Sequence, residues 1–390
     1  MNQAPQLPLW SLGLRFLRFG ALAWGGPIAQ IGALHQELVQ RECWVDEARF
    51  RQVLAVYQAL PGPEATEMCI WFGTLARGRI GGLVAGLGFL LPGLSLMLLA
   101  SWLLLGQPWP PWLLAAFAGM QAAVVALIAR AAWRLCRTAV HGDVLLGAIA
   151  TLSAIGAVLG APFAISLVAG GLLAACWRTQ WRWTALPILA IWASFLAFPA
   201  IGGSGLPLAP GTPQLDSAPS MATLFISGLR AGSLTFGGAY TAIPFLQADA
   251  VGAAGWMTQR QFVDGLAVGG IMPSPLIIFG TWVGYAGGGL WGALLLTLGI
   301  FLPAFTFPLL LHHQLERLVA NVRLHQLLDG ITAAVTGLIA AVGLHLATTL
   351  SGWPDITIGI CALIALCRCT QRFAVLPIMA AAAAAGWLTH

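Results

Sequence analysis

The stretch Arg18-Phe-Gly-Ala-Leu-Ala-Trp24-Gly25-Gly26-Pro27 decides how the rest of the chain is organised. It places an arginine and a Gly-Gly-Pro break inside a segment that is otherwise apolar enough to enter a bilayer. A second copy, Arg230-Ala-Gly-Ser-Leu-Thr-Phe236-Gly237-Gly238, follows 212 positions later and aligns Arg18 with Arg230. Glycine and proline interrupt helices, so the repetition of their positions predicts a repetition of structure.

The repeat continues far beyond this stretch. The further matches are Trp44 with Trp256, Pro61 with Pro273, Pro63 with Pro275, Pro92 with Pro303 and Gly119 with Gly330, the last two after a slip of one residue. We therefore predict two homologous halves, residues 9–201 and 221–388, joined by a polar, Pro/Gly-rich linker over residues 202–220. Chance similarity between two apolar helical bundles is the alternative.

The composition indicates a membrane protein. Hydrophobic residues make up 59% of the 390 positions and charged residues only 8%, so a soluble chain of this length would lack polar residues to cover its surface. The net charge of +5 comes from arginine alone, since the chain contains no lysine. Arginine tolerates partial burial and binds oxyanions through a fork of donors, although a GC-rich genome would also favour it.

Apolar stretches suited to helices predict an all-α polytopic protein with about 12 to 13 transmembrane segments. They lie near residues 9–34, 50–76, 80–106, 111–135, 143–159, 161–177, 184–201, 221–248, 262–288, 289–311, 326–348, 353–367 and 373–388. An odd number of these segments separates the two copies, so the second half is expected to be inverted relative to the first. Many secondary transporters are built in this way and bind their substrate near the membrane midplane.

The distribution of arginine favours a cytoplasmic N-terminus. With that orientation the opposite connections, at residues 107–111, 202–220 and 351–355, contain no arginine, as the positive-inside rule demands. The connection over residues 36–51 breaks the pattern, because it carries three arginines on the outer side. Either the first segment enters the bilayer and returns without crossing it, or the rule fails locally.

The breaks suggest an anion site. A helix that restarts at Pro27 would point its N-terminus, with unpaired amides and partial positive charge, into the membrane. Arg18, ten residues into a helix, would lie roughly 13 Å deep, and Arg230 would reach a similar depth from the opposite face. An arginine at this depth is costly unless it serves a function, although an ion pair that fixes packing or a snorkelling side chain are alternatives.

The second segment of each half also contains a predicted helix break. Asp46 and Thr258 are placed to cap helices, and Thr258 with Gln261 has the spacing of a capping box. Each helix then breaks at a Pro-x-Pro sequence, so that four half-helix starts could converge. The predicted substrate-binding residues are Arg18, Gly25, Gly26, Pro27, Gln30, Pro61, Gly62, Pro63, Arg230, Thr235, Gly237, Gly238, Pro273, Ser274 and Pro275.

Two acidic residues make the halves unequal. Glu64 and Glu67 follow the first Pro-x-Pro break, whereas Leu276 and Phe279 stand at the matching positions of the second half. The carboxylates could simply complement a helix N-terminus. The sharper hypothesis makes one of them a protonatable coupling group or the counter-charge of Arg18.

The sequence lacks the usual equipment for catalysis. It contains no Walker loop, no G-x-S-x-G and no Cys-x-x-Cys pair, and Cys367-Arg-Cys369 is too closely spaced for an ordinary zinc site. We predict no enzymatic activity, no cofactor, no metal site and no nucleic-acid partner. The expected partners are a small inorganic oxyanion and the lipid bilayer, and a homodimer is left open.

Several motifs resemble the chromate ion transporter family in its long two-domain form. They are Trp24-Gly-Gly-Pro-Ile-Ala-Gln30, His35-Gln-Glu37, Trp44 and Leu60-Pro-Gly-Pro-Glu64-Ala in the first half, and Thr235-Phe-Gly-Gly238 and Pro273-Ser-Pro275 in the second. Family members usually have Phe where Trp24 stands and Gly where Ser274 stands. The resemblance implies efflux of chromate, or of the chemically similar sulfate, across a bacterial inner membrane.

Together these observations predict a secondary transporter that exports chromate or a similar tetrahedral oxyanion. Arg18, Arg230 and the amide ends of the broken helices are expected to bind the anion near the midplane. An oxyanion channel is the nearest alternative, because nothing in the sequence proves alternating access. A membrane enzyme or scaffold without transport is the alternative from another class.

Overall fold

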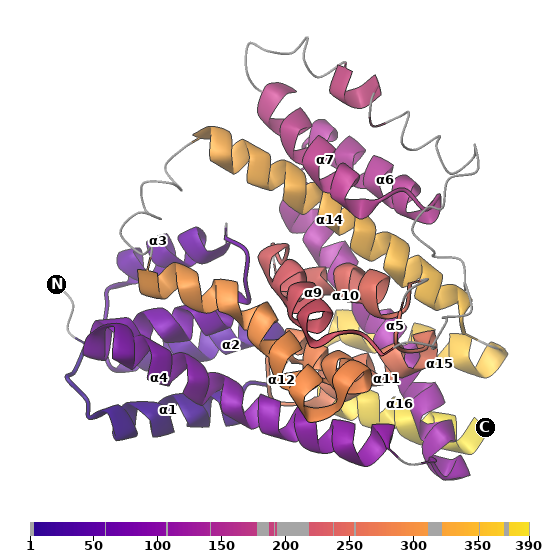
Figure 1. The fold of residues 1–390 in the computed structure, drawn as a ribbon, viewed down its shortest axis with the longest axis horizontal. Helices are drawn as coiled ribbons and strands as arrows, with labels where there is room; N and C mark the ends of the chain where they lie inside the picture. Colours follow the sequence, from indigo (N-terminus) through magenta and orange to yellow (C-terminus); the bar gives the residue numbers. More distant parts are fainter. Residues whose placement is uncertain are drawn as a thin grey trace.

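In the computed structural model the described part of the chain is helical and contains no strand, which confirms the prediction of an all-α protein (Figure 1). The structure describes residues 4–58, 60–106, 108–140, 142–177, 187–190, 192, 218–236, 238–252, 255–310, 322–350, 352–369 and 374–389. Among these residues four helices are long and apolar enough to cross a membrane, namely α4 (Glu64–Leu105), α5 (Pro111–Val140), α12 (Phe279–Leu310) and α14 (Val322–Thr348). The protein is therefore a multi-pass membrane protein.

The first segment, residues 9–34, is a hairpin of two short helices. α1 (Leu9–Ala21) ends before Gly25 and Gly26, whose φ angles are 92° and 76°, and α2 (Gly26–Leu34) has Pro27 in its first turn. A straight helix would separate residues 15 and 42 by roughly 40 Å. Instead, Arg15 forms an ion pair with Glu42 and lies over the Trp44 ring. The chain turns back on itself, which favours the alternative that this segment returns without crossing and puts the 36–51 connection on the side of the N-terminus.

The second segment is also a hairpin. A π-helix, η1 (His35–Arg41), leads to α3 (Glu47–Gln58), which the Asp46 carboxylate caps by accepting from the Arg49 amide at 2.7 Å. The chain turns at Pro61-Gly62-Pro63, and the first part of α4 runs back, so that Phe72 stacks on Phe50 with ring centroids 6.3 Å apart. The predicted single span over residues 50–76 is thus two short helices.

The second half repeats both hairpins. α9 (Met221–Ser233) is followed by the returning η4 (Ala239–Ala242) and α10 (Ile243–Ala250), and Arg230 pairs with Asp249 across that turn. α11 (Gln259–Ile271) starts with the predicted capping box of Thr258 and Gln261. After η5 (Leu276–Ile278), α12 runs back along α11, and the Trp282 indole donates to the Gln261 carbonyl at 2.9 Å. The spans predicted over residues 221–248 and 262–288 are therefore hairpins as well.

The long helices α4 and α12 bend at equivalent positions. Arg77 and Gly78 have φ/ψ of −147°/31° and 61°/−156°, and Gly288 and Gly289 have −157°/27° and 58°/−148°. A positive φ with that ψ is open only to glycine. Beyond the bends the two helices cross antiparallel: space at residue 82 is bounded by Leu309, and space at residue 86 by Phe305. Because equivalent helices run in opposite directions, the second half is inverted relative to the first.

The halves interlock at the other end of the molecule. α5 packs against α15 (Trp353–Arg368) and α16 (Val375–Thr389) of the second half, while α14 packs against α6 (Val144–Val158) and α7 (Phe163–Trp177) of the first (Figure 1). Equivalent glycines allow these contacts, since a methyl group at Gly119 would overlap the Ala382 carbonyl and one at Gly330 the Gly170 carbonyl. Backbones this close gain dispersion contacts that a larger side chain would abolish.

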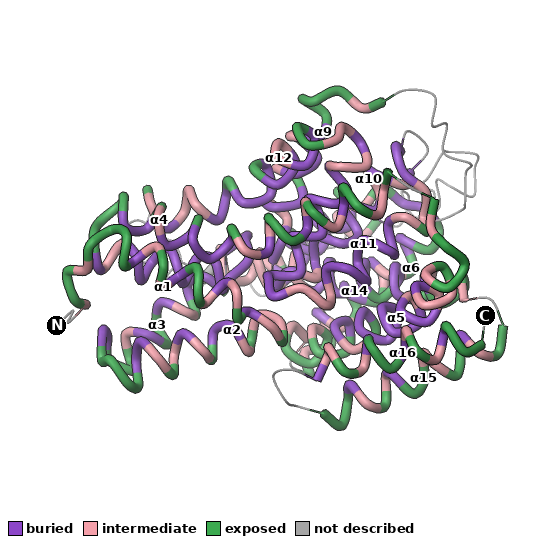
Figure 2. Tube along the Cα trace, turned by 90° about the horizontal axis from the view of Figure 1, so that it is seen from below, coloured by how far each residue is buried: buried purple, intermediate pink, exposed green. Residues whose placement is uncertain are grey.

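The outer surface is apolar, as a bilayer requires. The exposed residues lie on the outside of the helices (Figure 2), and on α4 they include Leu83, Leu87 and Leu91, spaced by one helical turn. The predicted linker over residues 202–220 lies outside the described residues apart from 218–220, so its role stays a prediction.

Candidate functional site

The turns of the four hairpins meet at the centre of the molecule, where the halves contact each other directly. The Gly62 amide of the first half donates to the Thr235 carbonyl of the second at 2.8 Å. The Trp24 indole donates to the Ile271 carbonyl at 3.2 Å. Each hairpin turn is thus held against a turn of the other half, and the helix ends that the turns create face the same region.

Each Pro-x-Pro turn packs against the long helix of the other half, and one member of each contact is glycine. A methyl group at Gly62 would lie 3.3 Å from the Ala304 side chain, while Ser274, which is equivalent to Gly62, lies against Gly93, which is equivalent to Ala304. A methyl group at Gly93 would overlap the Ser274 β-carbon. Ser274 is therefore accommodated by a glycine on the opposing helix.

A cavity of about 1310 Å³ opens between these turns and helices α5 and α14. It is lined by six of the residues predicted from the sequence, namely Gly25, Gly26, Pro27, Glu64, Gly238 and Ser274. The cavity thus brings together residues from three of the four breaks, namely Gly25-Gly26-Pro27, Gly237-Gly238 and Pro273-Ser274-Pro275.

The residues at which two helices begin line this cavity. α2 starts at Gly26 with Pro27 in its first turn and no side-chain cap, and no heavy atom lies within 4 Å of the space that a Gly26 side chain would occupy. Gly238, with φ of 124° and the same open space beside it, precedes η4. The unpaired amides and the helix dipole of α2 make this wall of the cavity attractive to an anion.

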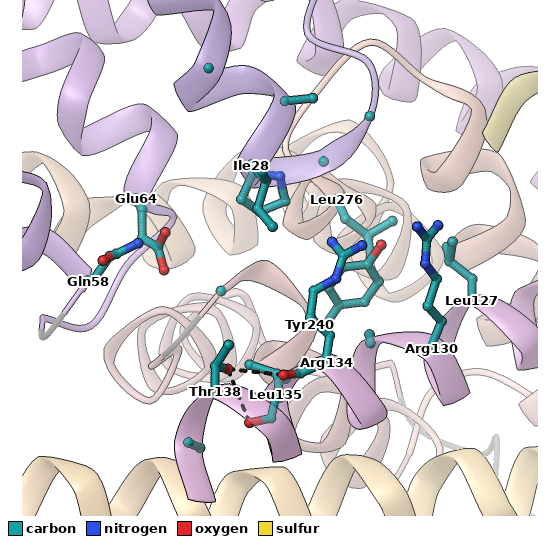
Figure 3. Close-up of a pocket in the computed structure, with 18 of the residues that line it drawn as sticks. Ile28, Gln58, Glu64, Leu127, Arg130, Arg134, Leu135, Thr138, Tyr240 and Leu276 are labelled. Atoms are coloured by element: carbon teal, nitrogen blue, oxygen red, sulfur yellow. Dashed lines mark hydrogen bonds between the residues drawn. The ribbon is translucent and has the colours of Figure 1, made fainter. Parts of the chain in front are cut away.

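Two arginines that sequence reasoning did not assign to the site line the cavity. Arg130 and Arg134 lie one turn apart on the same face of α5, and Figure 3 shows both side chains reaching into the space where Tyr240 also points. The sequence contained a signal for them, because Arg130 falls inside the apolar stretch 111–135 and Arg134 follows at helical spacing. Since α5 continues to Val140, neither belongs to a connection between helices.

Arg18 and Arg230 do not line the cavity, so the structure does not bring them together with the residues of the breaks. Arg18 is exposed on the outer face of α1, between Leu17 and the exposed Leu22, and no acidic side chain among the described residues pairs with it. Arg230 pairs with Asp249 and lies over the Phe163 ring, 5.2 Å from its centroid. The prediction assumed straight spanning helices. α1 and α9 are instead short, and their arginines lie away from the cavity that the hairpin turns border.

The remaining predicted residues support the site from behind. Gln30 is buried and donates to the Ala23 carbonyl at 2.8 Å, which ties α2 to the preceding turn. Thr235 is fully buried and accepts from Gly62 through its carbonyl. Pro61, Pro63, Pro273 and Pro275 shape the two Pro-x-Pro turns without lining the cavity, and Gly237 lies outside the described residues.

Of the two acidic residues that follow the first Pro-x-Pro break, Glu64 lies at the opposite wall of the cavity from the arginines (Figure 3). Glu64, the first residue of α4, lines the cavity and is 8% exposed, and the Gln58 side chain faces its carboxyl. Glu67 lies one turn further on and is fully buried, and neither of its carboxyl oxygens has a hydrogen-bond partner among the described residues. The Ser274 hydroxyl, also buried and unpartnered there, lines the same cavity.

Comparison with known proteins identifies relatives along the whole chain. A family model described as chromate transporter matches residues 10–198 and 222–387, once in each half. A chromate transport protein of Pseudomonas aeruginosa is 46% identical and covers 98% of this chain and 93% of its own length. A chromate transport protein of Cupriavidus metallidurans is 30% identical over 89% of this chain and 84% of its own length. No solved structure matches the chain.

Proposed function

The chain belongs to the chromate transporter family, and from this premise we propose that it is a secondary transporter that exports chromate or a similar tetrahedral oxyanion, such as sulfate, from the bacterial cytoplasm. One observation carries the proposal: the broken-helix ends at Gly25-Gly26-Pro27 and Gly238 share a cavity with Arg130 and Arg134. Substrate would bind in this cavity, with the arginines and the amides on different sides of the anion.

The donor types suit a tetrahedral dianion. A guanidinium presents two parallel N–H donors to a pair of oxygens, and backbone amides at a helix start supply further donors without any charge that must be neutralised in the empty state. Two arginines together balance the two negative charges of the anion. Because the cavity of about 1310 Å³ is far larger than the ion, the anion would enter with part of its water shell and tighten onto the donors as the halves close.

The inverted architecture offers a route to alternating access. The cavity is lined by both halves, and the turns of the two halves that border it are joined by the hydrogen bonds of Gly62 with Thr235 and of Trp24 with Ile271. A rocking motion about these contacts would close the cavity on one side of the membrane and open an equivalent space on the other. Arg18 and Arg230 have no place in the binding step of this scheme, and we assign them to the framework.

Uptake of chromate into proteoliposomes tests the proposal. Arg130→Gln and Arg134→Gln remove one charged donor each, so each is expected to weaken chromate binding by roughly tenfold to a hundredfold, as charged hydrogen bonds are worth about 1.5–3 kcal/mol. Arg137→Gln is the matched control, because Arg137 is exposed near the end of the same helix and does not line the cavity. Equal uptake by the double variant Arg130→Gln/Arg134→Gln and the wild type, in folded protein, would contradict the proposal.

A further inference from the structure

A carboxylate at an anion site needs an explanation. Glu64 lines the same cavity as Arg130 and Arg134, so an ionised Glu64 would repel the oxyanion that the arginines attract. If the carboxyl served only to neutralise the arginines in the empty protein, it would be expected beside them. Figure 3 shows it instead at the opposite wall, with Gln58 as its labelled neighbour.

Glu67 shows how little solvation this end of α4 provides. Its carboxyl is fully buried, and a methyl group built on Gly62 would lie only 2.8 Å from Oε1, so the turn backbone closes over it. An ionised carboxylate without donors in such a place would cost several kcal/mol. Because Glu64 stands one turn away on the same helix, two ionised groups here would also repel each other.

The other elements that pack against α4 supply little charge to this end of it. α2 and η5 have no titratable side chain and α12 has only Tyr285, while Tyr57 of α3 is buried next to Gln58. The remaining charged residues of these elements are Arg15 and Arg18 of α1, Glu47, Arg49 and Arg51 of α3, and Arg260 and Asp264 of α11. Across the cavity, the titratable lining groups are Arg130, Arg134, Tyr240, Asp143, His325 and Asp329. Glu64 is therefore the acid that both contacts the cavity and lies on its hairpin side.

We infer that Glu64 is a proton-binding site that couples one H⁺ to each oxyanion, an inference that rests on the proposed function. The proton comes from water in the cavity and binds a Glu64 carboxyl oxygen as the anion binds the arginines. Protonation removes the repulsion and adds a hydrogen-bond donor, so each ligand raises the affinity for the other by the same factor. On the opposite side of the membrane the anion leaves and the carboxyl returns its proton to water.

This coupling sets the charge that crosses the membrane. A dianion that travels with one proton carries a single net negative charge, so an inside-negative potential still drives it outwards, whereas an acidic exterior opposes its exit. The second half has Leu276 where the first has Glu64, and Leu276 also lines the cavity. Asp143 and Asp329 line other parts of the cavity, so Glu64 is the one carboxyl on its hairpin side, and the scheme assigns one proton to each anion.

Glu64→Gln and Glu67→Gln form a matched pair that tests the inference, since both replace a buried acid on α4 by its neutral isostere. Chromate flux is measured in proteoliposomes at a membrane potential fixed with potassium and valinomycin, and the potential of zero net flux is determined with and without a pH gradient. Wild type and Glu67→Gln should show a zero-flux potential that shifts with the gradient. Glu64→Gln should transport chromate with no additional shift beyond that caused by protonation of chromate itself, which is common to all variants.

The outcomes separate the inference from the function on which it rests. If the wild type shows no saturable chromate flux, the proposed function fails. If the wild type transports chromate and Glu64→Gln shows the same shift of zero-flux potential, proton coupling by Glu64 is overturned. If Glu67→Gln alone loses the shift, the proton site is at Glu67 and the assignment to Glu64 is overturned. Binding of chromate to solubilised Glu64→Gln, which should be retained, verifies that the variant is folded.

Discussion

The two halves of the protein share a backbone and differ in their chemistry. Both contain two hairpins and a long helix that bends at a glycine, Gly78 in the first half and Gly289 in the second, with φ/ψ within about ten degrees of each other. Glu64, Arg130 and Arg134 of the first half line the cavity, whereas the matching residues of the second are Leu276, Ala341 and His345. The duplication preserved the positions of the breaks, whereas Glu64 and the two arginines have no acid or arginine at their matching positions.

This difference indicates that two separate requirements act on the chain. The breaks and the small residues at close contacts are needed in both halves. Each half contributes hairpin turns that line the cavity and one of the two long helices that cross beside it. Under the proposed function the charges are needed once, because a single anion would occupy the cavity between the halves. The same substitution made at equivalent positions of the two halves should therefore have similar effects on folding and different effects on transport.

The largest expected effect lies in the framework, at the equivalent glycines Gly119 and Gly330. A single methyl group at either position would overlap a backbone carbonyl of the helix packed against it. Gly119→Ala and Gly330→Ala should each destabilise the protein by about 1–3 kcal/mol, measured as a lower melting temperature and a lower folded yield in detergent. Gly147→Ala is the control, since a methyl group there meets only Val140 at 3.5 Å. A loss at one of the two glycines alone would show that the halves do not use these contacts equally.

The second effect concerns the charge in the cavity. Leu276→Glu gives the second half the carboxyl that only the first half has, in a residue that is 7% exposed and lines the cavity. An extra negative charge near the anion should raise the KM for chromate by roughly tenfold or more, measured as initial uptake rates in proteoliposomes. Leu276→Gln controls for the change in size and polarity. Equal KM values for the two variants would mean that the anion binds away from this wall.

A third and smaller effect is expected where each Pro-x-Pro turn packs against the long helix of the other half, with glycine on one side of the contact and a larger residue on the other. Gly93→Ala would force its methyl group onto Ser274, so it should cost about 1 kcal/mol or somewhat more in stability. Combining it with Ser274→Gly should restore most of the loss, because the double variant resembles the Gly62–Ala304 crossing of the first half. Melting temperatures of the two single variants and the double variant measure this coupling. Simple additivity would contradict the proposed contact.

The sequence predicted the elements that depend on local punctuation. Glycine and proline at a fixed offset indicated two homologous halves with broken helices, and the caps at Asp46 and Thr258 follow from residue type and spacing. Hydropathy could not reveal the hairpins, because a spanning helix and two antiparallel half-helices of the same residues have the same mean hydropathy. The arginines of residues 36–51 were the one local signal that the chain returns.

The site was harder to predict for a related reason. Arg18 and Arg230 were selected by their expected depth in the membrane, which was counted along a straight helix. The actual depth of a residue depends on where its helix ends and the chain turns back. Arg130 and Arg134 would have met the same criterion if α5 had been expected to continue to Val140. A helix break is visible in the sequence as glycine or proline, which is why the sequence could assign Gly25, Gly26, Gly238 and Ser274 to the site. Which arginines reach the cavity depends instead on how the helices pack.

The smallest effect should come from the two arginines that the repeat first drew attention to. Arg18→Gln is expected to fold and to transport chromate as the wild type does, because Arg18 is exposed and does not line the cavity. Arg230→Gln loses the pairing with Asp249 and the contact with Phe163, but a side chain that is 41% exposed should contribute no more than about 1 kcal/mol. The variants are compared by melting temperature and by chromate flux per folded molecule. Normal stability with abolished flux in Arg18→Gln would return Arg18 to the binding site, and it would mean that the chemistry of the two halves is more alike than their cavity-lining residues indicate.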